Sequence, residues 1–255
     1  MPVFSTPAIM LRRLDFGDYD LIVTFFSLRR GKISMIAKAA KKSTKRFGGI
    51  LELFSVLEVV VSSGRGKGLP ILQEAALKHP FSKIRADIRK TAYASYWAEL
   101  IYDWMEENER QTELYFLFKH VLSELDGSQT SDEVLSILFQ IRLLALSGHR
   151  PNFGHCCRCR TAMELIGHEK LVFDIVKGGI TCQRCAPDPS GGVSLSKGTV
   201  KQLLWVGSGD YAKAARIRFT SPAIEEGLTF LEAFVPYHLG KQPRSLKFLR
   251  HIRRG

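Results

Sequence analysis

Residues 20–37 read DLIVTFFSLRRGKISMIA, in which two runs rich in β-branched and aromatic residues flank a break at Arg30-Gly31. Runs of this kind, bounded by turn residues, are typical of β-strands. The same pattern continues on both sides of this stretch. We expect five strands, at residues 6–14, 20–27, 32–37, 53–62 and 70–77. Five short strands in about 80 residues favour a small β-barrel.

A five-stranded barrel of this size fits the OB-fold, which binds oligonucleotides on one face and through its loops. Downstream of Pro80 the apolar residues recur at intervals of three and four, which predicts helices. We expect helical segments at 84–104, 112–125, from a cap at Thr130 or Ser131 to about 147, 194–205 and 222–237. We interpret the aromatic residues of the first helix as core.

All five cysteines lie within one short segment, as Cys156-x-x-Cys159 and Cys182-x-x-Cys185 with Cys157 beside the first pair. A disulfide framework would spread its cysteines over the chain. Two such pairs instead bring four thiolates to one ion, and a tetrahedron of sulfur selects Zn²⁺. A thioredoxin-type site needs only one pair, and nothing favours an iron–sulfur cluster. We predict one structural zinc per chain, with Cys157 as a bystander.

These observations predict an α+β multidomain chain. The expected domains are an OB-fold at 1–80, a helical domain in two parts at 81–150 and 191–255, and an inserted zinc module at 151–190. The second helical part ends in a basic tail that holds Lys241, Arg244, Lys247, Arg250, Arg253 and Arg254.

The net charge of +12 is unevenly distributed along the chain. Residues 1–80 carry +7, 81–150 carry −3, 151–190 carry +1 and 191–255 carry +7, which together give +12. Segregated charge favours a surface that binds a polyanion. The candidate phosphate contacts are Lys32, Lys38, Lys41, Lys42, Lys45, Arg46 and Arg65. A solvated basic loop is the alternative, and the basic tail is either a second DNA contact or plain solvation.

Within the barrel, Phe25 and Phe26 are candidates for stacking on bases, although one of them is expected to be core. We find no convincing catalytic set. The glycine-rich stretch at 64–68 lacks P-loop spacing, and neither a Gly-x-Ser-x-Gly elbow nor a His-Glu-x-x-His motif occurs. We therefore expect a protein that is not an enzyme. With no candidate membrane span or secretory signal, we also expect it to be cytoplasmic.

Several segments together resemble the RecO family of bacterial recombination-mediator and DNA-repair proteins. They are FGDYDLIVT at 16–24, GKIS at 31–34, AKAAKKS at 37–43, RFGG at 46–49 and LLALSGHRP at 143–151, in an order that spans nearly the whole chain. The sequence departs from the family at Ala39, where Gly is common, and at Leu53, where Pro is usual. Neither departure removes a charge or a metal ligand.

The resemblance implies an N-terminal OB-fold and a helical domain with a zinc module set within it. It implies binding of single- and double-stranded DNA, strand annealing, and partnership with RecR. It also implies displacement of single-strand-binding protein, so that RecA can load. We expect the protein to be cytoplasmic and nucleoid-associated. The tail of single-strand-binding protein is expected in an apolar groove of the helical part with a basic rim.

Two other functions stay open from the residues alone. A zinc-ribbon protein that binds RNA or the ribosome would also combine basic surfaces with four cysteines. A pure adaptor, in which the acidic middle of the chain docks partners, would make the charge incidental.

Overall fold

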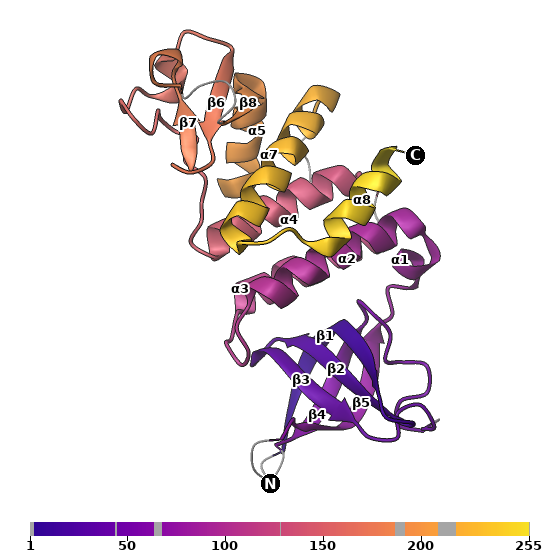
Figure 1. The fold of residues 1–255 in the computed structure, drawn as a ribbon. Helices are drawn as coiled ribbons and strands as arrows, with labels where there is room; N and C mark the ends of the chain where they lie inside the picture. Colours follow the sequence, from indigo (N-terminus) through magenta and orange to yellow (C-terminus); the bar gives the residue numbers. More distant parts are fainter. Residues whose placement is uncertain are drawn as a thin grey trace. The chain divides into compact units, whose positions relative to one another are not determined.

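The structure is a computed structural model that describes residues 3–43, 45–63, 68–127, 129–186, 192–208 and 218–254. The chain divides into two compact units. Unit 1 comprises Met1–Ser128 together with Pro243–Gly255, and unit 2 comprises Gln129–Gln242. Figure 1 shows the elements of both units. This division separates residues 129–150 from 81–128, so the expected extent of the helical domain stays a prediction.

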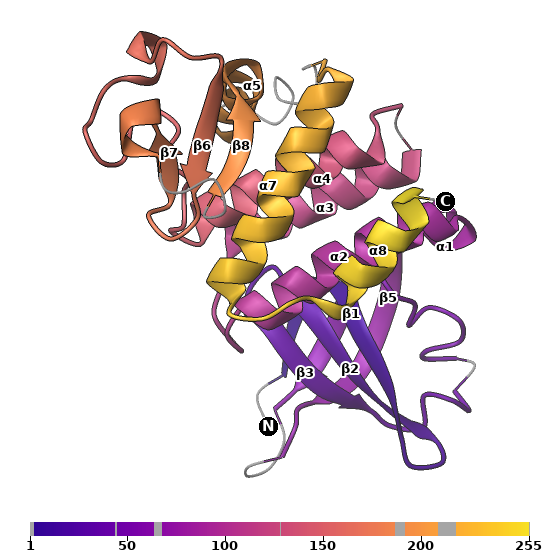
Figure 2. The ribbon, with the colours of Figure 1, turned by 45° about the horizontal axis from the view of Figure 1, so that its top comes forward.

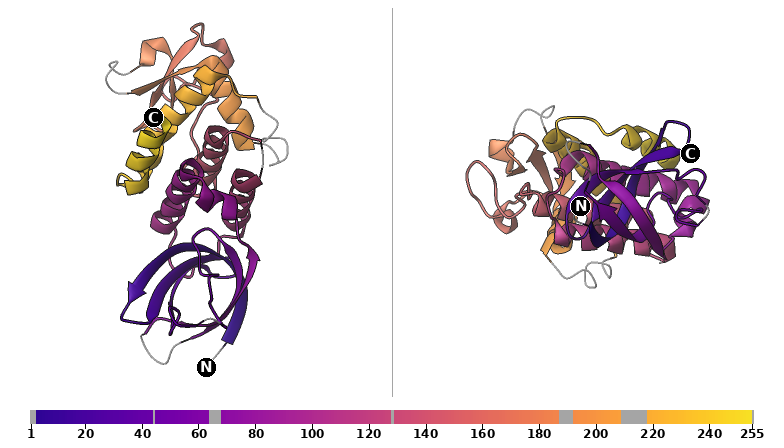
Figure 3. Two further views of the ribbon diagram at one scale, coloured as in Figure 1. Left: turned by 90° about the vertical axis from the view of Figure 1, so that its right-hand side faces the viewer. Right: turned by 90° about the horizontal axis from the view of Figure 1, so that it is seen from below.

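Five strands open unit 1: β1 (Val3–Phe16), β2 (Asp20–Ser27), β3 (Gly31–Ala37), β4 (Val56–Ser62) and β5 (Ile71–His79). They form a closed barrel in the order β1-β2-β3-β5-β4, visible end-on in the left view of Figure 3. All neighbouring strands are antiparallel except β3 and β5, whose parallel pairing at Ile36 and Ile71 closes the ring. The five expected strands are thus present, although β4 begins at Val56 rather than 53.

The barrel interior explains why these runs form strands. Along β3 every second residue is buried, and Ile33, Met35 and Ala37 point into the core. The two candidate stacking residues, Phe25 and Phe26, are both 0% exposed. The interpretation of Phe25 and Phe26 as base-stacking residues is therefore wrong, because neither ring is accessible to a base.

The helices of unit 1 are α1 (Ser82–Ala86), α2 (Ile88–Trp104), α3 (Thr112–Gly127) and α8 (Arg244–Arg254). The single helix expected over 84–104 is divided at Asp87, which has extended backbone angles. The Asp87 carboxylate caps α2 by accepting from the backbone N–H groups of Arg89 (2.8 Å) and Lys90 (3.1 Å). Most of the expected basic tail is helix α8, which lies along α2 (Figure 2).

Unit 2 contains α4 (Asp132–Leu146), α5 (Lys197–Ser208) and α7 (Ser221–Leu239) beside a sheet in the order β7-β6-β8. The strands are β6 (Lys170–Asp174), β7 (Gly179–Thr181) and β8 (Gly192–Ser196), and short 3-10 helices span Met163–Leu165 and Gln183–Cys185. Of the two expected caps of α4, Thr130 and Ser131, the structure uses Ser131, whose hydroxyl accepts from the Val134 N–H. Ser194 does not open a helix, because it pairs with Val172 in the sheet and α5 begins at Lys197.

Aromatic rings connect the sheet of unit 2 to its helices. Phe173 of β6 lies 4.6 Å from Phe230 and 5.1 Å from Phe234 of α7, measured between ring centroids, and Phe153 joins the same cluster. All four rings are buried. This packing ties the cysteine-bearing segment to α7. In the described part of the chain, no helix is long and apolar enough to cross a membrane.

Candidate metal centre and nucleic-acid interface

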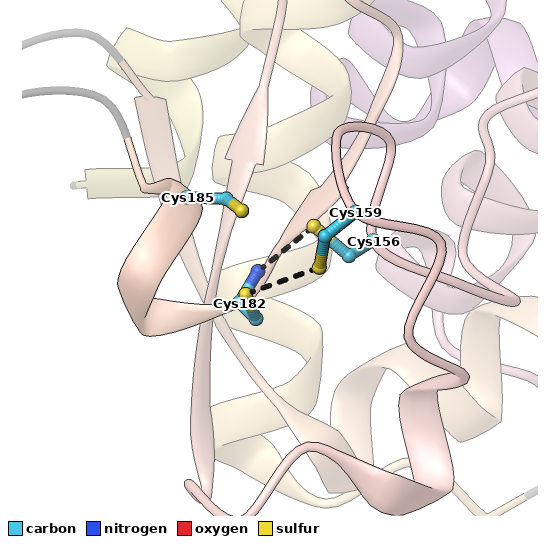
Figure 4. Close-up of side chains that lie close together, drawn as sticks. All are labelled: Cys156, Cys159, Cys182 and Cys185. Atoms are coloured by element: carbon cyan, nitrogen blue, oxygen red, sulfur yellow. Dashed lines mark hydrogen bonds between the residues drawn. The ribbon is translucent and has the colours of Figure 1, made fainter.

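The four predicted metal ligands converge at one point in unit 2. The sulfur atoms of Cys156, Cys159, Cys182 and Cys185 all lie within 4.8 Å of one another (Figure 4). Zn–S bonds of about 2.3 Å in a tetrahedron place sulfurs about 3.8 Å apart. The distance between the Cys159 and Cys182 sulfurs is 3.6 Å. The spacing of the sulfurs therefore fits a metal ion bound by four thiolates.

Local backbone structure sets this convergence. The first pair of cysteines lies in a turn in which Arg160 N–H donates to Cys156 O (3.0 Å) and Arg160 adopts a positive φ of 64°. The second pair follows β7 and ends in a 3-10 turn. A backbone hydrogen bond from Cys157 N–H to Ile180 O (2.8 Å) joins the first turn to β7. The β6–β7 hairpin thus holds the two pairs together.

Close approach to the first turn explains a glycine in β7. A Cβ atom added at Gly179 would lie 3.0 Å from the Cβ of Cys157 and 3.2 Å from that of Asn152. The Asn152 N–H and carbonyl meanwhile bond to Gly178 and Ile180. A side chain at position 179 would therefore crowd the turn that carries the first cysteine pair where it meets β7.

The close approach of the sulfurs shifts the pKa values of the cysteine thiols. Hydrogen bonds from Thr161, through its side chain and backbone, and from Cys156 and Cys182 lower the pKa of Cys159 to about 6. Hydrogen bonding to Cys182 and Cys159 raises the pKa of Cys185 to about 12. These opposite shifts arise because the sulfurs lie within hydrogen-bonding distance of one another. A bound cation would favour the thiolate form of every ligand, as a structural metal requires.

Cys157 is outside the group of four sulfurs. It is half-buried, and burial followed by the charge of Asp174 raises its pKa. The carboxylate of Asp174 forms an ion pair with the guanidinium of Arg158, with 3.5 Å between the oxygen and the nitrogen. Because its sulfur is not among the four that converge, Cys157 is a bystander of the candidate site, as the spacing of the cysteines predicts.

The basic segment of residues 38–46, which we call the basic loop, follows β3 at one end of the barrel. It packs against the β1–β2 turn: the Ala39 N–H donates to the Asp20 carboxylate (2.7 Å) and the Lys41 N–H donates to Tyr19 O (3.0 Å). Ala39 adopts a positive φ of 54°. This backbone region explains why a glycine suits the position and why Ala39 adds strain there.

The candidate phosphate contacts in the loop differ in what they already bind. Lys41 forms an ion pair with Asp15 (3.3 Å), and Arg46 donates to Lys38 O (3.0 Å). The Lys42 ammonium lies 3.4 Å from the centre of the Tyr19 ring. Lys38, Lys41, Lys42, Lys45 and Arg46 are all exposed residues, although the Lys41 side chain itself is only 30% exposed. The loop therefore presents its positive charge to solvent while Lys41 and Arg46 hold its shape.

The two other candidates are placed differently. Lys32 is half-buried; its ammonium donates to Tyr102 O (2.6 Å) and lies 4.9 Å from the centre of the Tyr102 ring. It therefore holds the barrel against the end of α2. Arg65 lies outside the described residues.

Two exposed aromatic residues beside the loop were not singled out from the sequence. Phe16 and Tyr19, at the end of β1 and in the β1–β2 turn, are 48% and 47% exposed. The sequence does show two aromatic residues around Gly17 in a predicted turn, which could have marked them as candidates. Their proximity to the lysines of the basic loop is visible only in the structure. Only the barrel register brings these segments together, because β2 pairs with both β1 and β3.

Two models of known protein families together match most of the chain. The model of the recombination protein O N-terminal domain matches residues 1–81, and that of its C-terminal domain matches residues 85–247. The chain belongs to the RecO family. A DNA repair protein RecO from Desulfatibacillum aliphaticivorans is 46% identical over 255 residues, which cover 100% of this chain and 99% of that protein.

Other relatives carry the same name. A protein from Desulfosudis oleivorans is 46% identical, with 99% of each chain covered, and one from Syntrophus aciditrophicus is 32% identical, with 98% and 96% covered. The expected family is therefore confirmed. Membership of the RecO family supports a role in DNA repair and recombination.

Proposed function

We propose that this protein is a non-enzymatic recombination mediator that binds single- and double-stranded DNA and anneals complementary strands. The observation that carries the proposal is the basic loop beside the exposed rings of Phe16 and Tyr19 at one end of the barrel. Lysines neutralise phosphates, and aromatic rings stack on unpaired bases. Neutralising two strands lowers their mutual repulsion, so annealing needs no nucleotide hydrolysis. We also assign the barrel to the OB-fold class, because it has five strands and closes in the order β1-β2-β3-β5-β4.

A binding experiment tests the role of the loop. The variant Lys38→Gln/Lys45→Gln removes two exposed charges and leaves the loop contacts of Lys41 and Arg46 in place. If both lysines contact phosphates, the slope of log affinity against log salt for single-stranded DNA should fall by about 1.4, at about 0.7 for each contact. The control Lys177→Gln/Lys201→Gln removes two exposed charges from unit 2 and should leave the slope unchanged. Equal slopes for the loop variant and the parent would refute the proposal.

A second experiment separates stacking from charge. The variant Tyr19→Ala should weaken binding to single-stranded DNA by about 1–3 kcal/mol per base that stacks on the ring, and should affect duplex binding less. Phe116→Ala is a suitable control, because this α3 residue is 50% exposed and far along the chain from the loop. Equal losses for single strands and duplex would contradict a stacking role for Tyr19.

We propose Zn²⁺ as the metal of the four-cysteine site, in a structural role. Four thiolates with no open position select zinc and leave no place for a substrate. The metal would clip the turn that carries Cys156 and Cys159 to the segment after β7. Metal analysis of the purified protein should find one zinc per chain, and Cys182→Ser should lose it. Absence of equimolar zinc in the parent protein would refute this assignment.

The remaining partners are proposed from family membership. RecR, the C-terminal tail of single-strand-binding protein and, indirectly, RecA would place annealing within recombinational repair in the cytoplasm. An annealing assay on strands precoated with single-strand-binding protein, with and without RecR, tests this directly. Competition between single-stranded DNA and RNA at one salt concentration tests the alternative of an RNA-binding zinc protein, and preference for RNA would favour that alternative.

A further inference from the structure

Helix α8 has the sequence RSLKFLRHIRR and contains no acidic residue. Its two buried leucines, Leu246 and Leu249, are each 1% exposed, and the helix packs along α2 (Figure 2). The apolar side of α8 is thus already covered by the protein. What remains for a partner is its outward face.

The outward face is almost entirely basic. Its exposed residues are Arg244, Lys247, Phe248, Arg250, His251 and Arg254. Apart from Phe248, they recur at intervals of three and four, which places them in one stripe along the helix. Eleven residues at 1.5 Å per residue extend about 16 Å, which matches the rise of four to five nucleotides in one DNA strand, at 3.4 Å each.

Helix stability alone does not account for this composition. Basic residues in the last turn are favourable to the helix dipole, which explains Arg253 and Arg254. Arg244 and Lys247 lie in the first half, where positive charge is unfavourable, and like charges at Lys247 and Arg250 repel each other. Positive charge is therefore retained at positions where it costs the helix stability.

The helix is also held in a fixed position within unit 1. The carboxylate of Glu99 in α2 accepts from the backbone N–H groups of Arg244 (2.9 Å) and Ser245 (2.8 Å), and from the Ser245 hydroxyl. This carboxylate caps the positive end of α8. The basic stripe therefore stands on a helix that is anchored at its first turn and along its apolar side.

We propose that the outward face of α8 is a second phosphate-binding surface, which contacts the backbone of DNA in addition to the basic loop of the barrel. A membrane surface fits poorly, because insertion needs the apolar side that α2 already covers. An acidic peptide needs apolar anchors as well as charge, and Phe248 is the one large apolar side chain among the exposed residues of the helix. A polyanion of repeating charge matches the stripe best.

The test measures binding of the full-length protein to a 30-base-pair DNA duplex across a range of salt concentrations. The variant Lys247→Gln/Arg254→Gln removes two outward charges and leaves the buried leucines and the Glu99 cap intact. The slope of log affinity against log salt should fall by about 1.8, at about 0.9 for each lost phosphate contact. The control Lys177→Gln/Lys201→Gln should retain the parent slope. Lys247→Gln removes a charge that is unfavourable to the helix and Arg254→Gln removes a favourable one, so the two effects oppose each other. The unfolding temperature of both variants should therefore stay close to that of the parent protein, since all four residues are exposed.

The outcomes distinguish this inference from the proposed function on which it rests. If the parent binds DNA and the α8 variant retains the parent slope, the second surface is refuted and the basic loop still accounts for binding. An equal fall in the control would also refute it, because the effect would then follow net charge rather than position. If the parent does not bind DNA, the proposed function and the second surface both fail.

Discussion

Replacing Gly31 by alanine should destabilise unit 1 through one identifiable clash. Gly31 begins β3 with a positive φ of 62°, and a Cβ atom there would lie 1.8 Å from the backbone oxygen of Glu109. Nonbonded atoms need at least 3.0 Å, so the segment around Glu109 must move away. That movement would disturb the hydrogen bond from Asn108 N–H to Lys32 O (2.9 Å), which holds this segment on the barrel.

The size of the effect follows from two contributions. Alanine in the left-handed region costs about 1–2 kcal/mol, offset by about 0.4–1 kcal/mol because alanine restricts the unfolded chain. Displacing the segment and leaving its backbone groups without partners costs about a further 2 kcal/mol. Gly17 provides a matched control, because it has a φ of 59° and a Cβ there meets nothing within 4 Å. We expect a loss of about 3 kcal/mol for Gly31→Ala and about 1 kcal/mol for Gly17→Ala.

Urea unfolding followed by tryptophan fluorescence measures both variants. Trp97 and Trp104 belong to α2 in unit 1, whereas Trp205 belongs to α5 in unit 2. A Trp205→Phe background therefore limits the signal to unit 1, which is needed because the two units can unfold separately. Equal losses for the two glycine variants would refute the clash and leave only the cost of the backbone angle.

Three further predictions concern the cap of α8, the half-buried pair His149 and His238, and the metal. Glu99→Gln removes the charge that caps α8 and should weaken its anchoring by about 1 kcal/mol, seen as about fivefold faster amide exchange in α8; unchanged exchange would contradict the anchoring role. Burial, and then His149 at 4.4 Å between ring centroids, lowers the pKa of His238 from its ordinary 6.5, so the folded state binds this proton less readily than the unfolded state. The contribution of neutral His238 to the stability of unit 2 is therefore complete above pH 6.5 and is lost progressively below it. At equal metal content, the His238→Phe variant should lose less stability between pH 7 and pH 5 than the parent protein does. Identical dependence of stability on pH in the two proteins would contradict this role of His238. If the four thiolates hold the proposed zinc, removing it with a chelator should speed amide exchange across residues 152–186 by more than tenfold while leaving the barrel unchanged, and an equal change in both units would argue against a local metal clip.

The sequence by itself determined the elements whose signals are local. The runs of β-branched and aromatic residues within 20–37, the cap at Thr130 or Ser131, and the spacing of Cys156, Cys159, Cys182 and Cys185 each depend on neighbours in the chain. The strands, the cap and the convergence of the four sulfurs appear in the structure. Patterns of this kind can be recognised without knowing the fold because hydrogen bonding, capping and the geometry of paired cysteines act over a few residues.

Only the tertiary structure decided features that depend on distant segments. It buried Phe25 and Phe26, and it brought exposed Phe16 and Tyr19 beside the basic loop through strand pairing. Similarly, the sequence shows the basic residues of 241–255 but not that Leu246 and Leu249 pack on α2, more than 140 residues away in the chain. Which side of a helix or strand faces outward depends on the partner that covers the other side, and that partner is set by the fold as a whole.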